Sequence, residues 1–424
     1  MKYNIHSVKG MHDHLPLDAR LLNKIENIFK KILFNYHYSE IRLPILEKTD
    51  LFQKSIGQIT DIIGKEMYSF NDKNGHSLTL RPEGTAGCVR SVIQNNLLYH
   101  NNPKLWYSGP MFRYERPQTG RYRQFNQLGI ETFGFSEPYI ELELITIINK
   151  FFKKLQIDPH VTLEINCIGS IQSRIQYQKK LKNFLNKNIH LLDKNCIYQL
   201  YNNPLRILDS KKKNIQKLLL NAPILINYID KKSKFYFHQL CYLMNYFNIK
   251  YTINYRLVRG LDYYNNTVFE WKTKSLGTQN TICAGGRYDA LVQQLGGPST
   301  PSCGLAIGVD RLLLLLKKLS IFQQKKDKID IYIFFSLQSI QMLVFDVSEK
   351  IRNYKPNLKI SLELKIKPFK KILKNIVQYK SKIILFLGEK EVKSKRIIIY
   401  NTKNQIYKVV KMKNIFTIIN SIFL

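Results

Sequence analysis

The chain has 424 residues, 44% of them hydrophobic, which is enough for two or three domains with large cores. No apolar stretch reaches the roughly 20 residues that span a bilayer, and MKYNIHSVKGMHDHLP at the start lacks the apolar run of a signal peptide, so we expect a cytoplasmic protein. The formal net charge of +35 indicates a polyanionic partner, although the abundance of Lys, Asn, Ile and Tyr is also typical of AT-biased coding.

Histidines and cysteines do not predict a metal site. His6, His12 and His14 lie close together near the start, but no cysteine is near them, and we expect surface or hydrogen-bonded histidines. The six cysteines are scattered without a Cys-x-x-Cys pair, which argues against both a disulfide framework and a zinc site.

Residues 111–131, MFRYERPQTGRYRQFNQLGIE, predict a long hairpin. The outgoing strand runs over 112–115, and a polar loop over 116–122 precedes the return. Period two places Arg113 and Glu115 on one face of the outgoing strand. One face of the return carries Phe125, Gln127, Gly129 and Glu131. Polar residues that share a strand face suit a ligand floor, whereas an edge hairpin with solvated charges is the alternative.

The region 169–250 reads as helical. Its apolar residues recur at helix spacing, and Pro204 and Pro223 mark breaks between helices. The spaced apolar residues are Leu181, Phe184, Leu185, Ile215, Leu218 and Leu219. A helical insertion is the simplest interpretation.

Two short strings, RLVRGLDYY (256–264) and AGGRYD (284–289), combine cations, tyrosines and glycines. A core strand would alternate apolar and polar residues, whereas these strings crowd polar side chains beside glycines that let backbone approach a ligand. The polar residues are Arg259, Asp262, Tyr263, Tyr264, Arg287 and Tyr288. Either string alone is as consistent with a salt-bridged turn, but together with the hairpin they favour a binding pocket.

The string GLAIGVDR (304–311) predicts a strand that meets a helix at Gly308, with Arg311 at the start of the helix. The five leucines that follow are too few to cross a membrane and predict a buried helix.

Residues 323–327 (QQKKD) suit a linker. Beyond them, strand-like runs at 330–335, 359–364, 381–387 and 396–400 alternate with helical stretches at 338–352, 368–378 and 411–422, which predicts an α/β module. Residues 327–424 hold 20 Lys and Arg against 7 Asp and Glu, a net charge of +13.

Three of these segments resemble the motifs of class II aminoacyl-tRNA synthetases. IRLPILEKTDLF around Pro44 is similar to motif 1, the Arg113 hairpin to motif 2, and GLAIGVDR to motif 3. LVRGLDYY and AGGRYD resemble the two motifs specific to histidyl-tRNA synthetases, with support from KGMHDHLP, LRPEGTAG and NPLRILDSK. Asp310 is a departure, because Glu is common there in the family.

The resemblance implies an α+β catalytic domain built on an antiparallel sheet, formed by 1–168 and 251–325. It also implies a helical insertion domain at 169–250 and a C-terminal α/β anticodon-binding domain at 327–424. Motif 1 builds a dimer interface in the family, so a homodimer is expected.

The resemblance further implies that the chain activates histidine with ATP to histidyl-adenylate and transfers histidine to the 3′ end of histidine tRNA. Two anions must meet in the first step, so fixed guanidinium groups are needed, and Arg113 and Arg259 are the expected catalytic residues. ATP enters as a substrate with Mg²⁺, without a tightly bound protein metal site.

The remaining expected roles also come from the resemblance. The expected ATP-binding residues are Arg113, Glu115, Arg121, Phe125 and Arg311. The expected histidine-binding residues are Glu83, Thr85, Gln127, Glu131, Arg259, Tyr263, Tyr264 and Tyr288. Arg116 and Gln118 are expected to contact the tRNA acceptor end.

Two alternatives stay open. One is the synthetase-like regulatory subunit of ATP phosphoribosyltransferase, which lacks an anticodon domain and intact ATP-binding arginines. The other is a class II synthetase for a different amino acid, against which the paired histidine-type motifs argue.

Overall fold

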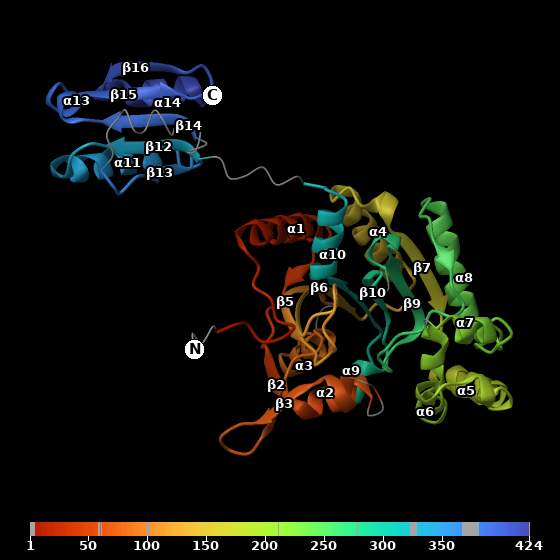
Figure 1. The fold of residues 1–424 in the computed structure, drawn as a ribbon. Helices are drawn as coiled ribbons and strands as arrows, with labels where there is room; N and C mark the ends of the chain where they lie inside the picture. The colour runs from red at the N-terminus through yellow and green to blue at the C-terminus, as the bar shows by residue number, and fades with distance from the viewer. Residues whose placement is uncertain are drawn as a thin grey trace. The chain divides into compact units, whose positions relative to one another are not determined.

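The computed structural model divides the chain into two compact units, residues 1–322 and 323–424 (Figure 1). The structure describes residues 5–57, 60, 62–99, 102–210, 212–277, 279–322, 329–366 and 381–423. The predicted linker at 323–327 and the predicted helix at 368–378 lie outside these residues. Among the described residues, no helix is both long and apolar enough to cross a membrane.

An eight-stranded sheet forms the centre of the first unit, in the order β1-β5-β6-β11-β10-β9-β7-β8. The strands are β1 (Ser39–Glu40), β5 (Lys104–Phe112), β6 (Gln124–Phe133), β7 (Thr162–Cys167), β8 (Thr252–Ile253), β9 (Asn265–Lys272), β10 (Thr281–Arg287) and β11 (Ser302–Gly308). Neighbours are antiparallel except at the two ends, where β1 pairs with β5 and β8 with β7 in parallel. The prediction of an α+β unit on an antiparallel sheet is confirmed.

Long helices cover this sheet with apolar faces. Leu21, Ile25, Phe29 and Leu33 of α1 (Pro16–Asn35) are buried, each four residues after the last, and therefore form one stripe. In Figure 1, α1 lies beside α10 (Val309–Lys318) and α4 (Tyr139–Lys154), and α1 contacts both. The predicted strand-to-helix junction at Gly308 is confirmed, and four of the five leucines are buried in α10.

Three further helices and a smaller sheet also belong to this unit. The helices are α2 (Thr49–Ile56), α3 (Thr85–Gln94) and α9 (Leu291–Gln294), and the three-stranded sheet holds β2 (Leu46–Lys48), β4 (Ser77–Leu80) and β3 (Tyr68–Asn71), with β4 in the middle.

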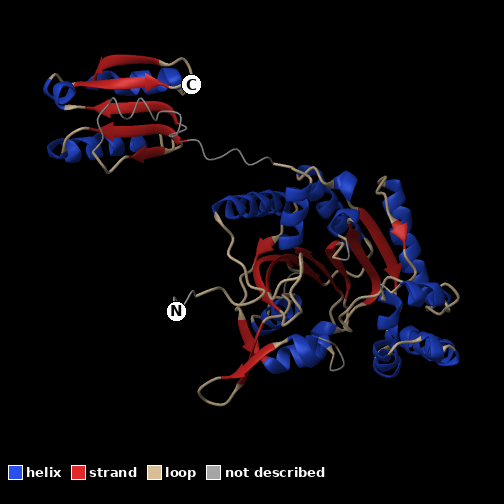
Figure 2. Ribbon diagram, in the orientation of Figure 1, coloured by secondary structure: helices blue, strands red, loops and turns tan. Residues whose placement is uncertain are grey.

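The region between β7 and β8 is helical, as predicted, and Figure 2 shows this in its colouring. Its helices are α5 (Ile171–Lys187), α6 (Lys194–Asn202), α7 (Lys213–Leu219) and α8 (Lys231–Tyr246). A 3-10 turn begins at Pro204, and Pro223 follows the end of α7, so both predicted breaks are confirmed.

The second unit holds a five-stranded sheet in the order β13-β12-β14-β15-β16. Its strands are β12 (Ile329–Phe335), β13 (Ile360–Leu362), β14 (Ser381–Leu387), β15 (Arg396–Asn401) and β16 (Ile406–Lys411), and its helices are α11 (Gln341–Tyr354), α13 (Glu389–Lys393) and α14 (Ile415–Ile422). The four predicted strands are confirmed. The sequence did not predict β16, which forms because it pairs along its whole length with β15.

The hairpin of β5 and β6 corrects one expectation. The outgoing strand ends at Phe112, so Arg113 and Glu115 lie in the connecting loop and not on a strand face. One backbone bond, from Arg113 N–H to Arg123 O at 2.9 Å, still closes the hairpin, after which Glu115 N–H turns back to Arg113 O at 2.7 Å. In this turn the two side chains have different partners: Arg113 donates to Pro82 O, and Glu115 pairs with Arg121.

Candidate active site

A cavity of about 1120 Å³ opens in the first unit. It lies between the large sheet, the hairpin loop, α7 and the segment that precedes β9. Eleven of the fifteen residues predicted for the site line it: Glu83, Thr85, Arg113, Glu115, Arg121, Phe125, Gln127, Arg259, Tyr263, Tyr264 and Arg311. These residues come from four separate segments of the chain and line one cavity.

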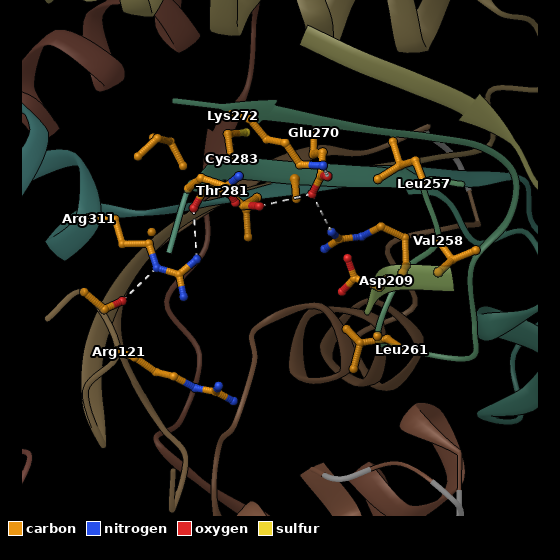
Figure 3. Close-up of a pocket in the computed structure, with 18 of the residues that line it drawn as sticks. Arg121, Asp209, Leu257, Val258, Leu261, Glu270, Lys272, Thr281, Cys283 and Arg311 are labelled. Carbon is orange, nitrogen blue, oxygen red and sulfur yellow. Dashed lines mark hydrogen bonds and ion pairs between the residues drawn. The ribbon is translucent and has the colours of Figure 1, made fainter. Parts of the chain in front are cut away.

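Arginines gather at one end of the cavity. Arg113 donates from Nε to Pro82 O at 2.9 Å, and its guanidinium lies 5.2 Å from the centre of the Phe125 ring. Arg311 is held by three bonds, to Gly120 O at 2.8 Å, Thr281 O at 2.9 Å and Gln279 Oε1 at 3.0 Å, two of which Figure 3 shows. Burial, together with the positive charge of the other arginines, lowers the pKa of Arg311 from its usual value. Such a cluster of cations favours an anionic ligand.

Two carboxylates balance part of this charge. Arg121 forms an ion pair with Glu115 through Nε, and its Nη2 lies 3.5 Å from Glu66 Oε1. The structure thus brings Arg121 and Glu115 together at the cavity wall.

Arg259 occupies another part of the wall. Its Nη1 lies 3.7 Å from Glu270 Oε2, its guanidinium lies 5.4 Å from the centre of the Tyr264 ring, and its Nε is buried with no hydrogen-bond partner among the described residues. Burial alone lowers the pKa of Arg259, but the adjacent Tyr264 and Glu270 outweigh it and raise that pKa. The guanidinium is therefore charged and keeps one donor for a ligand.

Glu83 lies at the N-terminus of α3. Its carboxylate accepts from Thr85 N–H at 2.9 Å and Ala86 N–H at 2.7 Å, and Tyr263 donates to it at 3.3 Å. These contacts fix the carboxylate, because helix N-termini favour negative charge. Burial nevertheless raises the pKa of Glu83 above its usual value.

Gln127 presents an unused acceptor. It lines the cavity from β6, and its Oε1 is buried without a hydrogen-bond partner in the described part of the chain. A buried polar atom of this kind has a free-energy cost unless a ligand satisfies it.

Glu131 and Tyr288 lie behind the cavity wall. Glu131 is 0% exposed and accepts from Thr85 Oγ1 at 2.6 Å, from the Tyr107 hydroxyl at 3.3 Å and from the Tyr288 hydroxyl. Burial raises the pKa of Glu131 to about 8. The predicted ligand face of β6 is therefore split, with Phe125 and Gln127 in the cavity and Glu131 beneath it.

The last two predicted residues lie outside the cavity. Arg116 and Gln118 have exposed side chains on the hairpin loop, where Gln118 and Arg121 form a paired backbone bridge.

The expectation that Arg287 belongs with the pocket residues is wrong, because its side chain does not line the cavity. It is buried against α4, where Nε and Nη2 donate to the two oxygens of Glu141 at 2.9 and 3.0 Å. A bidentate carboxylate partner is the preferred environment of a buried guanidinium, which explains why this side chain turns away from the cavity.

Some lining residues escaped the sequence analysis. Figure 3 shows Glu270, Lys272 and Thr281 on adjacent strands. Glu270 and Lys272 alternate with buried Phe269 and Trp271 on β9, so period two would have placed them on one polar face. Lys213 and Lys217, four residues apart on α7, also line the cavity, but a pair of lysines on a helix has no distinctive signal.

No metal centre accompanies the cavity in the described ranges, since no three His, Cys, Asp or Glu side chains there are grouped to hold an ion. His14 instead contacts Asp310, with Nε2 at 3.3 Å from Oδ1.

Known proteins are similar to this chain in sequence and in fold. The sequence pattern of the family described as histidyl-tRNA synthetase matches residues 10–312. A histidine–tRNA ligase of Buchnera aphidicola subsp. Schizaphis graminum is 53% identical over 403 residues, 95% of this chain and 94% of the relative. One from Blochmanniella pennsylvanica is 50% identical over 415 residues, 97% of this chain and 95% of the relative. The crystal structure of apo S. aureus histidyl-tRNA synthetase is similar with a TM-score of 0.80 at 30% identity, covering 98% of this chain and 99% of that one.

Proposed function

Because the chain belongs to the histidyl-tRNA synthetase family, we propose which of its residues carry each step of the family's reaction. The chain is a histidine–tRNA ligase. It activates histidine with ATP, which forms histidyl-adenylate and releases pyrophosphate, and then transfers histidine to the 3′ end of histidine tRNA with release of AMP.

The observation that carries the proposal is the convergence of Arg113, Arg259 and Arg311 on one cavity from three distant segments. In the first step the histidine carboxylate attacks the α-phosphorus of ATP, and two anions must approach. We assign Arg113 and Arg259 to the α-phosphate from opposite sides. Fixed cations stabilise the charge that develops there, and their contacts to Pro82 O and Tyr264 hold them in place before the substrates arrive.

Arg311 and Arg121 are assigned to the outer phosphates, for which the planar guanidinium fork is better suited than lysine. Since Arg121 is paired with Glu115 in this structure, the triphosphate would replace that carboxylate on Arg121. Glu115 is then released to accept from the adenine amino group, and the adenine ring lies against Phe125.

Histidine selection is assigned to the buried polar groups. Glu83, Thr85 and Gln127 meet the charged ends of the amino acid, which would satisfy the unpaired Gln127 Oε1, and Tyr263 completes that wall. The imidazole offers one donor and one acceptor, so we assign it to Tyr264, which lines the cavity. Glu131 and Tyr288, which lie behind the cavity wall in this structure, are proposed as its other polar partners. A pocket that hydrogen-bonds its substrate rejects analogues without those groups by roughly 10⁴ to 10⁵.

Mg²⁺ is proposed to enter with ATP, bound to its phosphates. The donor set around the cavity fits this, because four of the five carboxylates that line it, Glu83, Glu115, Glu270 and Asp310, accept from protein donors or pair with cations.

Transfer to tRNA is assigned to the hairpin loop and the second unit. Arg116 and Gln118 are exposed on the loop and would read the acceptor end, including the extra 5′ guanosine of histidine tRNA. The basic module at 327–424 is assigned to the anticodon stem-loop.

A homodimer through the Pro44 segment completes the proposal, in the cytoplasm where tRNA is charged. Ile45 and Leu46 beside Pro44 are 43% and 38% exposed, which suits an interface. Arg81 donates to Leu43 O at 3.0 Å and to Pro110 O at 2.9 Å, so this segment is tied to the strand that leads to Arg113.

ATP–pyrophosphate exchange measured with each amino acid in turn tests the function. Histidine alone should support exchange. Exchange with another amino acid would indicate a different class II synthetase, and the absence of exchange with all of them would indicate a non-catalytic relative such as the phosphoribosyltransferase regulatory subunit.

A further inference from the structure

The side chains around the end of β10 form a partly buried polar cluster that the activation chemistry does not use. Its anchor is the ion pair of Arg287 and Glu141, whose side chains are 3% and 0% exposed. Arg287 also donates to Phe135 O at 3.0 Å and to Asp289 Oδ1 at 3.1 Å. These four bonds hold the guanidinium in one orientation. Removal of one member of such a buried pair is strongly destabilising.

Asp289 connects this anchor to the neighbouring strand. Its Oδ1 accepts from Arg287 and from Ser302 N–H at 3.0 Å, and its Oδ2 accepts from Asn265 Nδ2 at 3.0 Å. In return, Asp289 N–H donates to Asn265 Oδ1 at 3.1 Å. The two side chains therefore form a reciprocal pair in which each hydrogen-bonding atom has its partner.

This pair lies directly beside two tyrosines of the proposed histidine site. Asn265 follows Tyr264 and Asp289 follows Tyr288, so the pair joins the two backbone positions directly after the tyrosines. The pairing of β9 with β10 is irregular at this point, because the register shifts between Gly286 and Arg287. Beyond this shift the two strands are paired only at Arg287 and Asn265, so the side-chain bonds add to a single strand pair in fixing the separation of the two tyrosines.

The rings themselves are closely packed. The centres of the Tyr264 and Tyr288 rings are 6.4 Å apart with planes at 82°, and a Cβ added at Gly286 would lie 3.1 Å from Tyr264 Cδ1. Tyr288 donates to Glu131, whereas Tyr264 lines the cavity. A small shift between the strands would therefore separate the cavity tyrosine from the buried carboxylate beneath it.

We infer that Asp289 and Asn265, anchored by Arg287 and Glu141, are positioning residues for histidine selection. They hold Tyr264 and Tyr288 at one fixed spacing and touch no substrate. The inference rests on the proposed role of these tyrosines in binding the imidazole.

The substitution Asp289→Asn tests it. The new amide keeps Oδ1 for Arg287 and Ser302, but it turns an NH₂ group toward the NH₂ group of Asn265. If the amide at 289 rotated, its NH₂ group would face the donors of Arg287 and Ser302. If the amide of Asn265 rotated, its NH₂ group would face the backbone N–H of residue 289. We expect the KM for histidine to rise about 10-fold, the effect of one opposed pair of polar groups, while the KM for ATP stays within about 2-fold.

The double variant that swaps the residues at positions 265 and 289 should restore histidine binding. In Asn265→Asp with Asp289→Asn, the carboxylate at 265 accepts from both the backbone N–H and the new amide, so the reciprocal pair is restored. We expect the KM for histidine to return to within about 3-fold of the original, because all donors again meet acceptors. Asn265→Ala, which removes one partner without opposing donors, should raise the KM for histidine in the same direction as Asp289→Asn and serves if the latter does not fold.

Glu143→Gln is the matched control. Glu143 lies on α4 two residues from Glu141 and likewise accepts from a tyrosine, Tyr38 at 2.7 Å, and from a cation, Lys104 at 2.8 Å. It has no link to Tyr264 or Tyr288, so its substitution should leave both KM values unchanged. Thermal unfolding of each variant accompanies the kinetics.

Tyr264→Phe distinguishes a failure of the proposed role of Tyr264 from a failure of the positioning role of Asp289 and Asn265. If it does not raise the KM for histidine selectively, the proposed role of Tyr264 fails. If Tyr264→Phe does raise the KM for histidine selectively, three results with Asp289→Asn would overturn the positioning role. These are KM values like those of Glu143→Gln, a rise in both KM values together, or no recovery in the double variant.

Discussion

Thr85 Oγ1 donates a 2.6 Å hydrogen bond to Glu131 Oε1, which joins the start of α3 to the centre of the large sheet. Both residues are buried, and Thr85 also lines the cavity. A substrate that contacts Thr85 is therefore one bond away from a carboxyl group whose pKa burial raises to about 8. The protonation state of Glu131 should therefore affect the binding site through Thr85.

Stability should depend on pH through Glu131. Its pKa is about 8 in the folded chain and near its ordinary value of 4.5 in the unfolded chain, so between these values the folded state binds more protons. The free energy of unfolding should therefore fall as pH rises from 4.5 to 8, by at most about 1.4 kcal/mol per pH unit from this group.

Denaturant titrations of the original chain and of Glu131→Gln measure this dependence. The difference between them should decrease across the window and level off above pH 8. Glu83, whose pKa is also raised, is present in both chains, and Tyr107 and Tyr288 lose their protons only above the window. A difference that does not vary with pH would mean that Glu131 is ionised throughout.

Histidine use should be more sensitive than ATP use to changes in the selective pocket. Glu131→Gln and Tyr264→Phe each remove a polar group assigned to the imidazole, so the KM for histidine should rise about 10-fold or more, as expected when a hydrogen bond to a buried partner is lost. Pyrophosphate exchange with histidine and ATP varied separately provides the comparison. A rise confined to the KM for ATP would show that these residues serve the nucleotide.

The exposed hairpin loop should affect transfer and not activation. With Arg116 and Gln118 both changed to alanine, single-turnover transfer to tRNA should slow by at least about 10-fold, since a good contact to a base edge contributes about 1–3 kcal/mol. Exchange should be unchanged, because neither side chain lines the cavity. Equal losses in the two assays would place the loop on ATP.

Removal of residues 327–424 should separate charging from activation. The first unit has its own hydrophobic core, so it should fold, but the truncated chain loses a net charge of +13 and the proposed anticodon contact. Binding of tRNA should weaken, and its dependence on salt should decrease.

Exchange, aminoacylation at two salt concentrations and molecular mass are measured on the same truncated protein. A folded dimer that charges tRNA as well as the full chain would contradict the anticodon role. A parallel loss of both activities with dissociation would show that the second unit supports the dimer.

Local sequence patterns predicted a binding pocket, and the family resemblance supplied the roles expected of its residues. The strings around Arg113, Arg259 and Arg311 each contain glycines and charged residues in unbroken sequence, and all three arginines line one cavity. The antiparallel sheet was predictable from the family resemblance, and the helical insertion from the spacing of apolar residues such as Leu181 and Leu185.

Long-range partners account for the errors. The orientation of Arg287 is set by Glu141, 146 residues earlier, and no local pattern indicates that pairing. The end of β5 at Phe112 is set by the turn at Arg113 to Glu115, where strand periodicity continues in the sequence but not in the backbone. The strand β16 depends on its partner β15, since its own side chains are largely exposed.

Arg259→Ala in histidine-dependent pyrophosphate exchange tests the central claim that arginines from separate segments together stabilise the charge at the α-phosphate. The exchange rate should fall by roughly 10² to 10³, the usual effect of removing one such donor, while the circular dichroism spectrum stays close to that of the original chain. Exchange at the original rate in this variant would contradict the claim.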